Sequence, residues 1–190
     1  MKTWIALAAA MVAFVSGLVS APAAEAKKPI GGSFTTTLTI APTQVGTATI
    51  SGAITVNATR FAVDEQGRVV AIATLSGSVT VTEPTLGTGT IDVTGTRLVL
   101  TADVDADCAG HLDIDFRAVL QLRTTVTLTS TTGATIQFPI SATVPLGGSL
   151  SFTAETQAQR ALICEIAMLL EAGASPQELV EKLNVVLRLL

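Results

Sequence analysis

Hydrophobic and polar residues alternate along most of the chain between residues 31 and 153. In residues 34–40 the apolar side chains stand two apart with Thr between them, and this spacing returns in residues 50–56 and 125–129. A period of two is that of a β-strand with one face in a core and the other in water. The pattern predicts roughly eight or nine strands in an antiparallel β-sandwich or barrel, and it leaves open which of the two forms.

Short segments rich in Gly, Pro and small polar residues separate the alternating runs. They are residues 64–67, 83–87, 131–133 and 145–148. Such residues favour turns because they fix or relax the backbone angles that a reversal needs. We therefore expect the chain to turn at each of these four places.

After the last alternating run, the pattern changes to that of two helices. Leu162 and Ile166 share one stripe, and Gly173 stands where a helix is expected to end. A capping box that begins at Ser175, with Pro at the first helical position, predicts the second helix. Its apolar stripe consists of Leu179, Leu183, Val186 and Leu190. The sequence thus predicts a mainly β fold of the α+β class, in which two amphipathic helices in residues 154–190 form a hairpin on the β domain.

The first residues have the composition of a secretory signal peptide. Lys2 gives a positive start, residues 4–19 are almost entirely apolar, and small residues follow. An uncleaved anchor helix is the alternative, but the apolar run is shorter than the ~20 residues that a membrane span needs. We therefore expect export and cleavage.

The cleavage site divides the chain into its expected parts. Cleavage after Ala26 fits the small-x-small rule, and Ala23 and Ala24 are close alternatives. We expect residues 1–26 to be the signal peptide and residues 27–153 to form the antiparallel β domain. The mature protein is then secreted or periplasmic, with no stable membrane span.

The chain has two cysteines, Cys108 in the strand region and Cys164 in the first predicted helix. Export places both in an oxidising compartment, where two cysteines are expected to form a disulfide. This bond would hold the helical tail against the β domain. A reactive thiol is the alternative, but no basic residue is adjacent to Cys164, and only His111 is near Cys108 in the sequence.

Composition excludes two broad classes of protein. The 190 residues are 48% hydrophobic and 14% charged, so the chain has enough apolar residues for a core and is not disordered. Eleven Lys and Arg are outnumbered by fifteen Asp and Glu, and aromatic residues make up only 4% of the chain. A nucleic-acid partner is not expected, because there is no basic stripe and no set of aromatic side chains for stacking on bases.

One acidic segment is a candidate for metal binding. It contains Asp103, Asp105, Asp107, Asp113 and Asp115. Residues two apart on a strand share a face, so these carboxylates could gather the oxygen ligands that Ca²⁺ prefers. The EF-hand pattern fails, because the sixth position from Asp103 is Cys108 and the twelfth is Ile114. We predict a solvated acidic face and no metal site, with calcium as the open alternative.

The sequence offers no distinctive catalytic constellation. His111 is the only histidine, so a zinc site would need carboxylates or a cysteine to complete it. A Ser-His-Asp hydrolase is disfavoured because the Gly-x-Ser-x-Gly motif does not occur. We therefore predict that the protein is not an enzyme and has no catalytic residues and no cofactor.

Three segments of the chain carry a resemblance. They are the strand pair of residues 60–77, the segment from Cys108 with its alternating Leu112 and Ile114, and residues 162–167 with the Leu-rich helix after them. With its Thr-rich β body, Cys pair and Leu-rich helical C-terminus, the chain resembles a family of uncharacterised secreted bacterial proteins of about this length. The resemblance implies secretion, a Cys pair and a β body, and it implies no activity.

Two functional hypotheses follow. The first is a secreted structural or protein-interaction β domain with a filled interior, whose partner is an unknown protein or cell-surface component. The alternative is a small apolar-ligand carrier with a lipocalin-like barrel, which predicts an internal cavity of about 300–1,000 Å³. The low aromatic content disfavours the carrier. The oligomeric state, and the choice between periplasm and medium, do not follow from the sequence.

Overall fold

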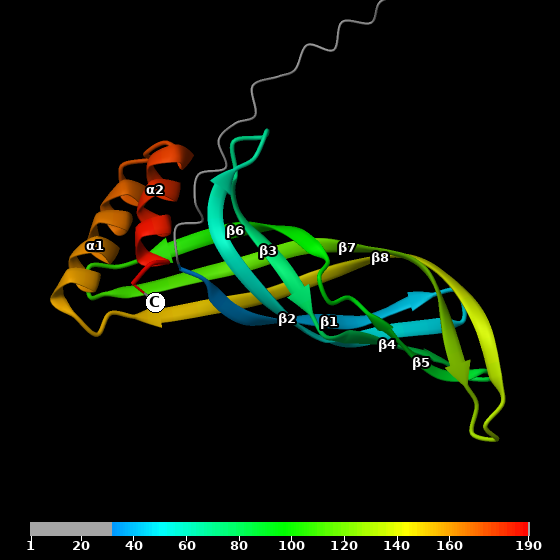
Figure 1. Ribbon diagram of the computed structural model, residues 1–190. Coiled ribbons are helices and arrows are strands. Elements are labelled where there is room, and N and C mark those ends of the chain that lie inside the picture. The colour runs from blue at the N-terminus through cyan, green and yellow to red at the C-terminus, as the bar shows by residue number, and fades with distance from the viewer. Residues whose placement is uncertain (1–31, 190) are drawn as a thin grey trace, which may run out of the picture. The chain divides into compact units, whose positions relative to one another are not determined.

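The computed structural model describes residues 32–189 (Figure 1). The expected signal peptide, residues 1–26, and Leu190 of the second helical stripe lie outside the described residues. The strands are β1 (Phe34–Val45), β2 (Ala48–Val63), β3 (Val69–Ser76), β4 (Ser78–Glu83), β5 (Gly87–Asp92), β6 (Arg97–Ala106), β7 (His111–Thr129) and β8 (Thr135–Thr153). The helices are α1 (Gln157–Glu171) and α2 (Pro176–Val186). The prediction of a mainly β fold with a C-terminal helical pair is confirmed.

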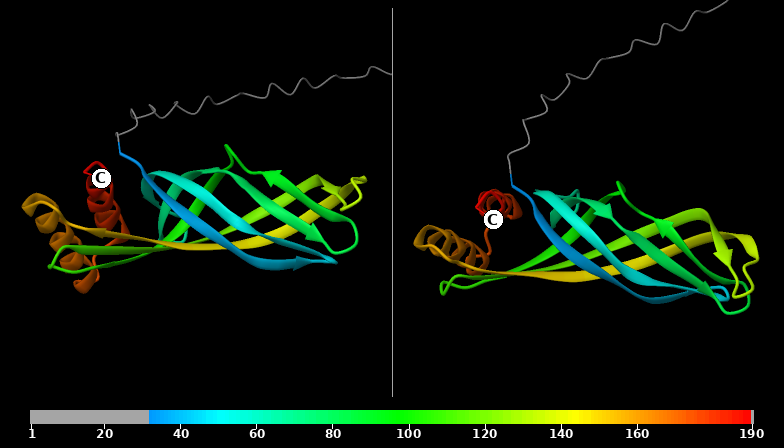
Figure 2. Two further views of the ribbon diagram at one scale, coloured as in Figure 1. Left: turned by 90° about the horizontal axis from the view of Figure 1, so that it is seen from below. Right: turned by 60° about the horizontal axis from the view of Figure 1, so that its bottom comes forward.

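All strand pairings are antiparallel, and together they form a closed ring. β1 pairs with β2, β2 with β3, β3 with β6, β6 with β7, β7 with β8, and β8 with β1 at Thr39↔Gly147. β4 and β5 form a second path between β2 and β7. Of the two arrangements that the sequence allowed, these pairings are those of a barrel. Figure 2 shows β1 in blue and β8 in yellow crossing beside each other where the ring closes.

The closing contact between β1 and β8 requires glycine. A Cβ atom at Gly148 would lie 2.6 Å from Cδ2 of Leu38 and 2.8 Å from the carbonyl oxygen of Thr37. At the neighbouring Gly147, which is exposed, the nearest such atom would be 4.0 Å away. The two strands approach this closely because position 148 has no side chain.

The expected turn at residues 145–148 is wrong, because β8 runs through it without a break. The other three expected turns lie between strands as predicted. Pro145 is tolerated because alternate residues of a strand direct their N–H and C=O groups to opposite neighbours. The carbonyl of Ser149, in the same alternate set, accepts a hydrogen bond from Thr36 of β1. The N–H that Pro145 lacks would therefore face β1, so the hydrogen bonds between β8 and β7 do not need it.

Apolar side chains fill the inside of the ring. Along β7, buried residues alternate with exposed ones from Leu112 to Leu128, except that Ala118 is half-buried and Thr124 is exposed. The exposed positions of β7 hold Thr, Asp, Arg, Gln, His and Val. The largest fully buried side chains are Phe116, Leu38, Ile40, Ile50, Ile54, Leu75, Leu100, Leu112, Ile114, Leu128, Ile163 and Ile166. Each such burial stabilises the fold by about 1.5–3 kcal/mol before entropy is counted.

The two helices lie together at one end of the strands (Figures 1 and 2). α2 contacts β2 and β3, whereas α1 contacts β6 and β7. The predicted capping box at Ser175 is present, since its hydroxyl accepts from the backbone N–H of Glu178. A second capping box, between Thr156 and Gln159, sets the start of α1. Gly173 follows α1 with a φ of 63°, as expected for a helix end.

Candidate functional site

The disulfide between Cys108 and Cys164 is present, as predicted. Cys108 lies in the turn between β6 and β7, and Cys164 lies within α1, with Cα atoms 4.1 Å apart. The same turn also contacts the start of the helical segment, because the N–H of Ala154 donates to the carbonyl of Gly110 over 2.8 Å. The bond therefore fixes the helical hairpin to the β6–β7 turn.

His111 is engaged by Asp107 within this turn. The carboxylate of Asp107 accepts from the backbone N–H of His111 over 2.9 Å and lies 2.8 Å from its ring Nδ1. The hydrogen bond from the backbone N–H of His111 is the main reason that the pKa of Asp107 lies below its ordinary value, and the hydrogen bond with the His111 ring is the second. Both side chains are about half exposed. The pair orders the turn that carries Cys108.

The other four aspartates of the acidic segment form two cross-strand pairs on the outer surface. Asp103 of β6 lies opposite Asp115 of β7, and Asp105 lies opposite Asp113. All four are exposed. Within residues 32–189 there is no group of three or more His, Cys, Asp or Glu side chains placed to hold a metal ion. Like charges placed directly opposite each other destabilise a sheet, so these pairs do not serve its stability.

A narrow apolar crevice lies beneath α2, at the end of the strands. The ring of Phe34, which lines the crevice, is centred 6.0 Å from that of Phe61 and 5.2 Å from that of the fully buried Phe116. The crevice is lined by Phe34, Phe61, Leu112, Ile114, Leu150, Phe152, Leu183, Val186 and Leu187. It has room for about one water molecule. Sites for small organic ligands are typically about 300–1,000 Å³, so the crevice is far smaller than the cavity that a carrier predicts.

Asn184 attaches α2 to the strand beside this crevice. Its side-chain oxygen accepts from the N–H of Phe61 over 2.8 Å, and its side-chain nitrogen donates to the carbonyl of Phe61 over 3.0 Å. Lys182 of α2 also forms an ion pair with Glu165 of α1. Asn184 was not among the residues expected from the sequence, although a polar residue beside the apolar stripe at Leu183 is a visible signal.

Glu83 is the second residue whose role the sequence did not reveal. Its side chain is only 5% exposed, at the turn between β4 and β5. One carboxylate oxygen accepts from the hydroxyl and the N–H of Thr85 and from the N–H of Leu86, each over 2.6 Å. The hydroxyl of Thr85 contributes most, and together these donors hold the pKa of Glu83 below its ordinary value of 4.5. The buried carboxylate is thus a structural part of the turn.

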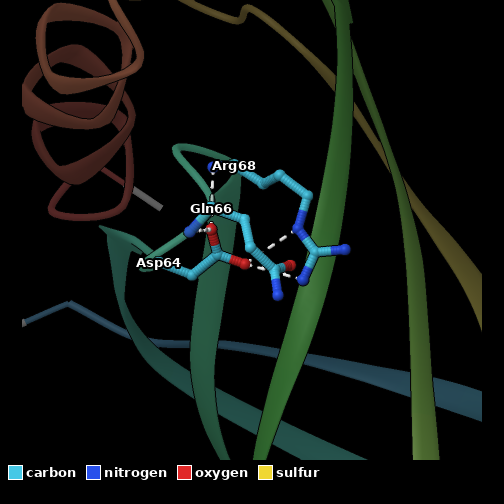
Figure 3. Close-up of polar contacts among 3 residues, drawn as sticks. All are labelled: Asp64, Gln66 and Arg68. Atoms are coloured by element: carbon cyan, nitrogen blue, oxygen red, sulfur yellow. Dashed lines mark hydrogen bonds and ion pairs between the residues drawn. The ribbon is translucent and has the colours of Figure 1, made fainter.

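Asp64 has the same function in the turn between β2 and β3 (Figure 3). Its carboxylate accepts from the backbone N–H groups of Gln66 and Arg68, each over 2.9 Å, and from Nε of Arg68 over 2.8 Å. The backbone N–H of Arg68 is the main reason that the pKa of Asp64 is lowered. Asp64 therefore stabilises the turn in one of the segments on which the family resemblance rests.

Comparisons with known proteins give no relative. No family model matches the chain, no curated protein is significantly similar to it, and no solved structure matches it. The resemblance to secreted bacterial proteins stays a prediction. Among the helices of residues 32–189, none is long and apolar enough to cross a membrane.

Proposed function

We propose that the protein is an exported, non-enzymatic interaction module that binds its partner through the outer surface of the closed sheet. The observation that carries this proposal is the packing of the interior. Aliphatic and phenylalanine side chains occupy the inside of the ring, and the crevice beneath α2 has room for about one water molecule. Because the interior is filled, we expect a partner to bind at the outward-facing residues of the strands.

Export is supported by the disulfide. A bond between Cys108 and Cys164 persists in an oxidising compartment and is rare where glutathione keeps thiols reduced. Together with the predicted signal peptide, it favours the periplasm or the medium as the place of action.

A small apolar-ligand carrier is the second candidate, and one observation favours it. Every residue that lines the crevice beneath α2 is apolar, and three of them are phenylalanines. A ligand would have to displace α2 to enter, because the present crevice is too small for it. The flexible Gly173 between the two helices is where such a movement would begin.

Native mass spectrometry of the mature, disulfide-bonded protein from its own host distinguishes the two candidates. The interaction module predicts the mass of the bare chain or of whole multiples of it. A reproducible additional mass of a few hundred daltons would instead establish the carrier. Leu150→Phe, which fills the crevice, is the matched variant, since it should abolish such a mass if the ligand binds beneath α2.

A further inference from the structure

We propose that the outward surface of β6 and β7 binds a second copy of the same surface, with the strands of the two copies antiparallel. This inference rests on the proposed function, because it names the partner of an outer surface. The surface is called the β6–β7 face and consists of Arg97, Val99, Thr101, Asp103, Asp115, Arg117, Val119, Gln121 and Arg123. Figure 1 shows antiparallel β6 and β7 side by side at the end of the sheet that carries the helices.

Two exposed valines form the centre of the β6–β7 face. Val99 and Val119 are each 53% exposed, the same fraction as Met168, and no other large hydrophobic residue of the described chain exceeds it. The last β6–β7 pair is Thr101↔Arg117, and each valine lies two residues beyond it on its own strand. Exposed hydrophobic side chains on an otherwise polar surface are typical of the centre of an interface.

The apolar centre extends to the two neighbouring strands. Val99 pairs with the half-buried Ile72 of β3, and Val119 pairs with Pro145 of β8. The fold does not need these side chains to be apolar, because they point away from the core. Thr fills many comparable outward positions of the same sheet.

Opposite charges lie at equal distances on either side of this centre. On β7, Asp115 stands four residues before Val119 and Arg123 four residues after it. At about 3.3 Å per residue, each charge is roughly 13 Å from the valine. No ion pair found within residues 32–189 includes Arg97, Arg117 or Arg123, so these cations are free to bind a partner.

This spacing makes the face complementary to itself in one orientation. When two copies stack with antiparallel strands about a two-fold axis, Val119 lies over Val119, and Arg117 lies over Gln121. Asp115 of each copy then lies over Arg123 of the other copy. Stacking with parallel strands would instead set each of these charged residues over the same residue of the other copy, so that like charges would meet. The charges therefore select the antiparallel, isologous arrangement.

The same arrangement accounts for one of the two opposed aspartate pairs. Asp103 and Asp115 lie directly opposite each other, which destabilises the isolated sheet. In the antiparallel dimer, Arg123 of the second copy lies over Asp115. Arg97 of the second copy lies two residues along β6 from the position over Asp103. The repulsion within one copy is offset by attraction to the other.

The dimer is expected to be weak and sensitive to salt. A face two strands wide on a curved sheet is smaller than the roughly 1,200 Å² total that specific, stable complexes bury. Ion pairs at the edge of such a contact are screened at high ionic strength. We therefore expect association at high protein concentration and low salt, and dissociation when salt is added.

Sedimentation equilibrium of the mature, disulfide-bonded protein tests the inference. Arg123→Asp and Asp115→Arg should each weaken dimerisation about tenfold or more, because each sets like charges over one another. The double variant D115R/R123D restores opposite charges in both pairs and should dimerise within about threefold of the wild type. Glu181→Arg, an exposed change on α2, is the control and should leave dimerisation unchanged.

A protein that stays monomeric at millimolar concentration and low salt would overturn the inference. Association that both single variants leave intact, or that the double variant fails to restore, would also overturn it. Melting temperatures of all variants show whether each is folded. A protein that sediments as a monomer under these conditions and carries no bound small molecule would contradict self-association alone, whereas a bound small molecule in native mass spectrometry would contradict the proposed function.

Discussion

The side chain of Asn184 on α2 forms hydrogen bonds with both the N–H and the C=O of Phe61, as a neighbouring strand would. β1 begins at Phe34, which pairs with Ala58, so β2 extends beyond its partner. The N–H and C=O of Phe61 on that side bind the side-chain oxygen and nitrogen of Asn184. The C-terminal helix is thereby joined to the sheet by hydrogen bonds at one point and by apolar packing around it.

This contact predicts the effect of replacing Asn184. Asn184→Ala leaves both backbone groups of Phe61 without a protein partner and should destabilise the fold by about 1–3 kcal/mol. Asn184→Asp keeps an acceptor for the N–H but sets a carboxylate oxygen against the carbonyl of Phe61, so it should also destabilise the fold. Urea unfolding followed by circular dichroism measures both. Equal stabilities for the wild type and Asn184→Ala would contradict the role given to this side chain.

Removal of the disulfide should loosen the helices before the sheet. The bond joins two residues that are 56 positions apart in the sequence. For a loop of this length, chain entropy gives a stabilisation on the order of 4 kcal/mol as an upper figure. Cys164→Ser should lower the melting temperature and expose residues 155–189 to protease while the β signal in circular dichroism is kept. Cys108→Ser should have the same effect, and the double variant no greater one. An unchanged digestion pattern would count against the clamp.

The ring closure predicts opposite outcomes for two adjacent glycines. Gly148→Val should destabilise the fold by about 1–3 kcal/mol, because its side chain would press on Leu38 and Thr37 where β1 meets β8. Gly147→Val is the control, since this position is exposed and spacious. Thermal unfolding compares the two variants. Similar melting temperatures would show that β1 and β8 are not in close contact.

Glu83 predicts a dependence of stability on pH. Its pKa is lowered in the folded state, so the unfolded chain binds a proton more readily. The stabilisation is therefore complete above the ordinary value of 4.5 and is lost as the pH falls through the lower, folded value. Glu83→Gln should melt below the wild type at neutral pH, and this difference should shrink in acid. A difference that is constant with pH would exclude the ionised carboxylate as its cause.

Calcium should leave the stability unchanged. The carboxylates of Asp103, Asp105, Asp113 and Asp115 point outward in two opposed pairs, without a third ligand placed to complete a site among residues 32–189. Millimolar Ca²⁺ should therefore shift the melting temperature by less than about one degree, because weak surface binding changes the unfolding free energy little. A rise of several degrees that Asp105→Asn abolishes would establish a calcium site.

Much of the fold was predictable because it depends on short stretches of sequence. Alternation along β7 identified a strand, the capping box at Ser175 identified the start of α2, and the presence of two cysteines predicted the disulfide. The turn expected at residues 145–148 failed for the opposite reason. Pro and Gly favour turns locally, but here the pairing of β8 with β7 and the approach of β1 decided the backbone.

The sequence by itself determined which faces are buried, where the second helix begins and which cysteines join. Only the tertiary structure decided that the sheet closes on itself, that Asp103 faces Asp115, and that Asn184 reaches Phe61. The physical reason is range: periodicity and capping involve residues within a few positions of each other. Ring closure at Thr39↔Gly147 and the contact of Asn184 with Phe61 join residues more than a hundred positions apart. These contacts and the strand register follow from how the whole set of strands packs around one apolar interior.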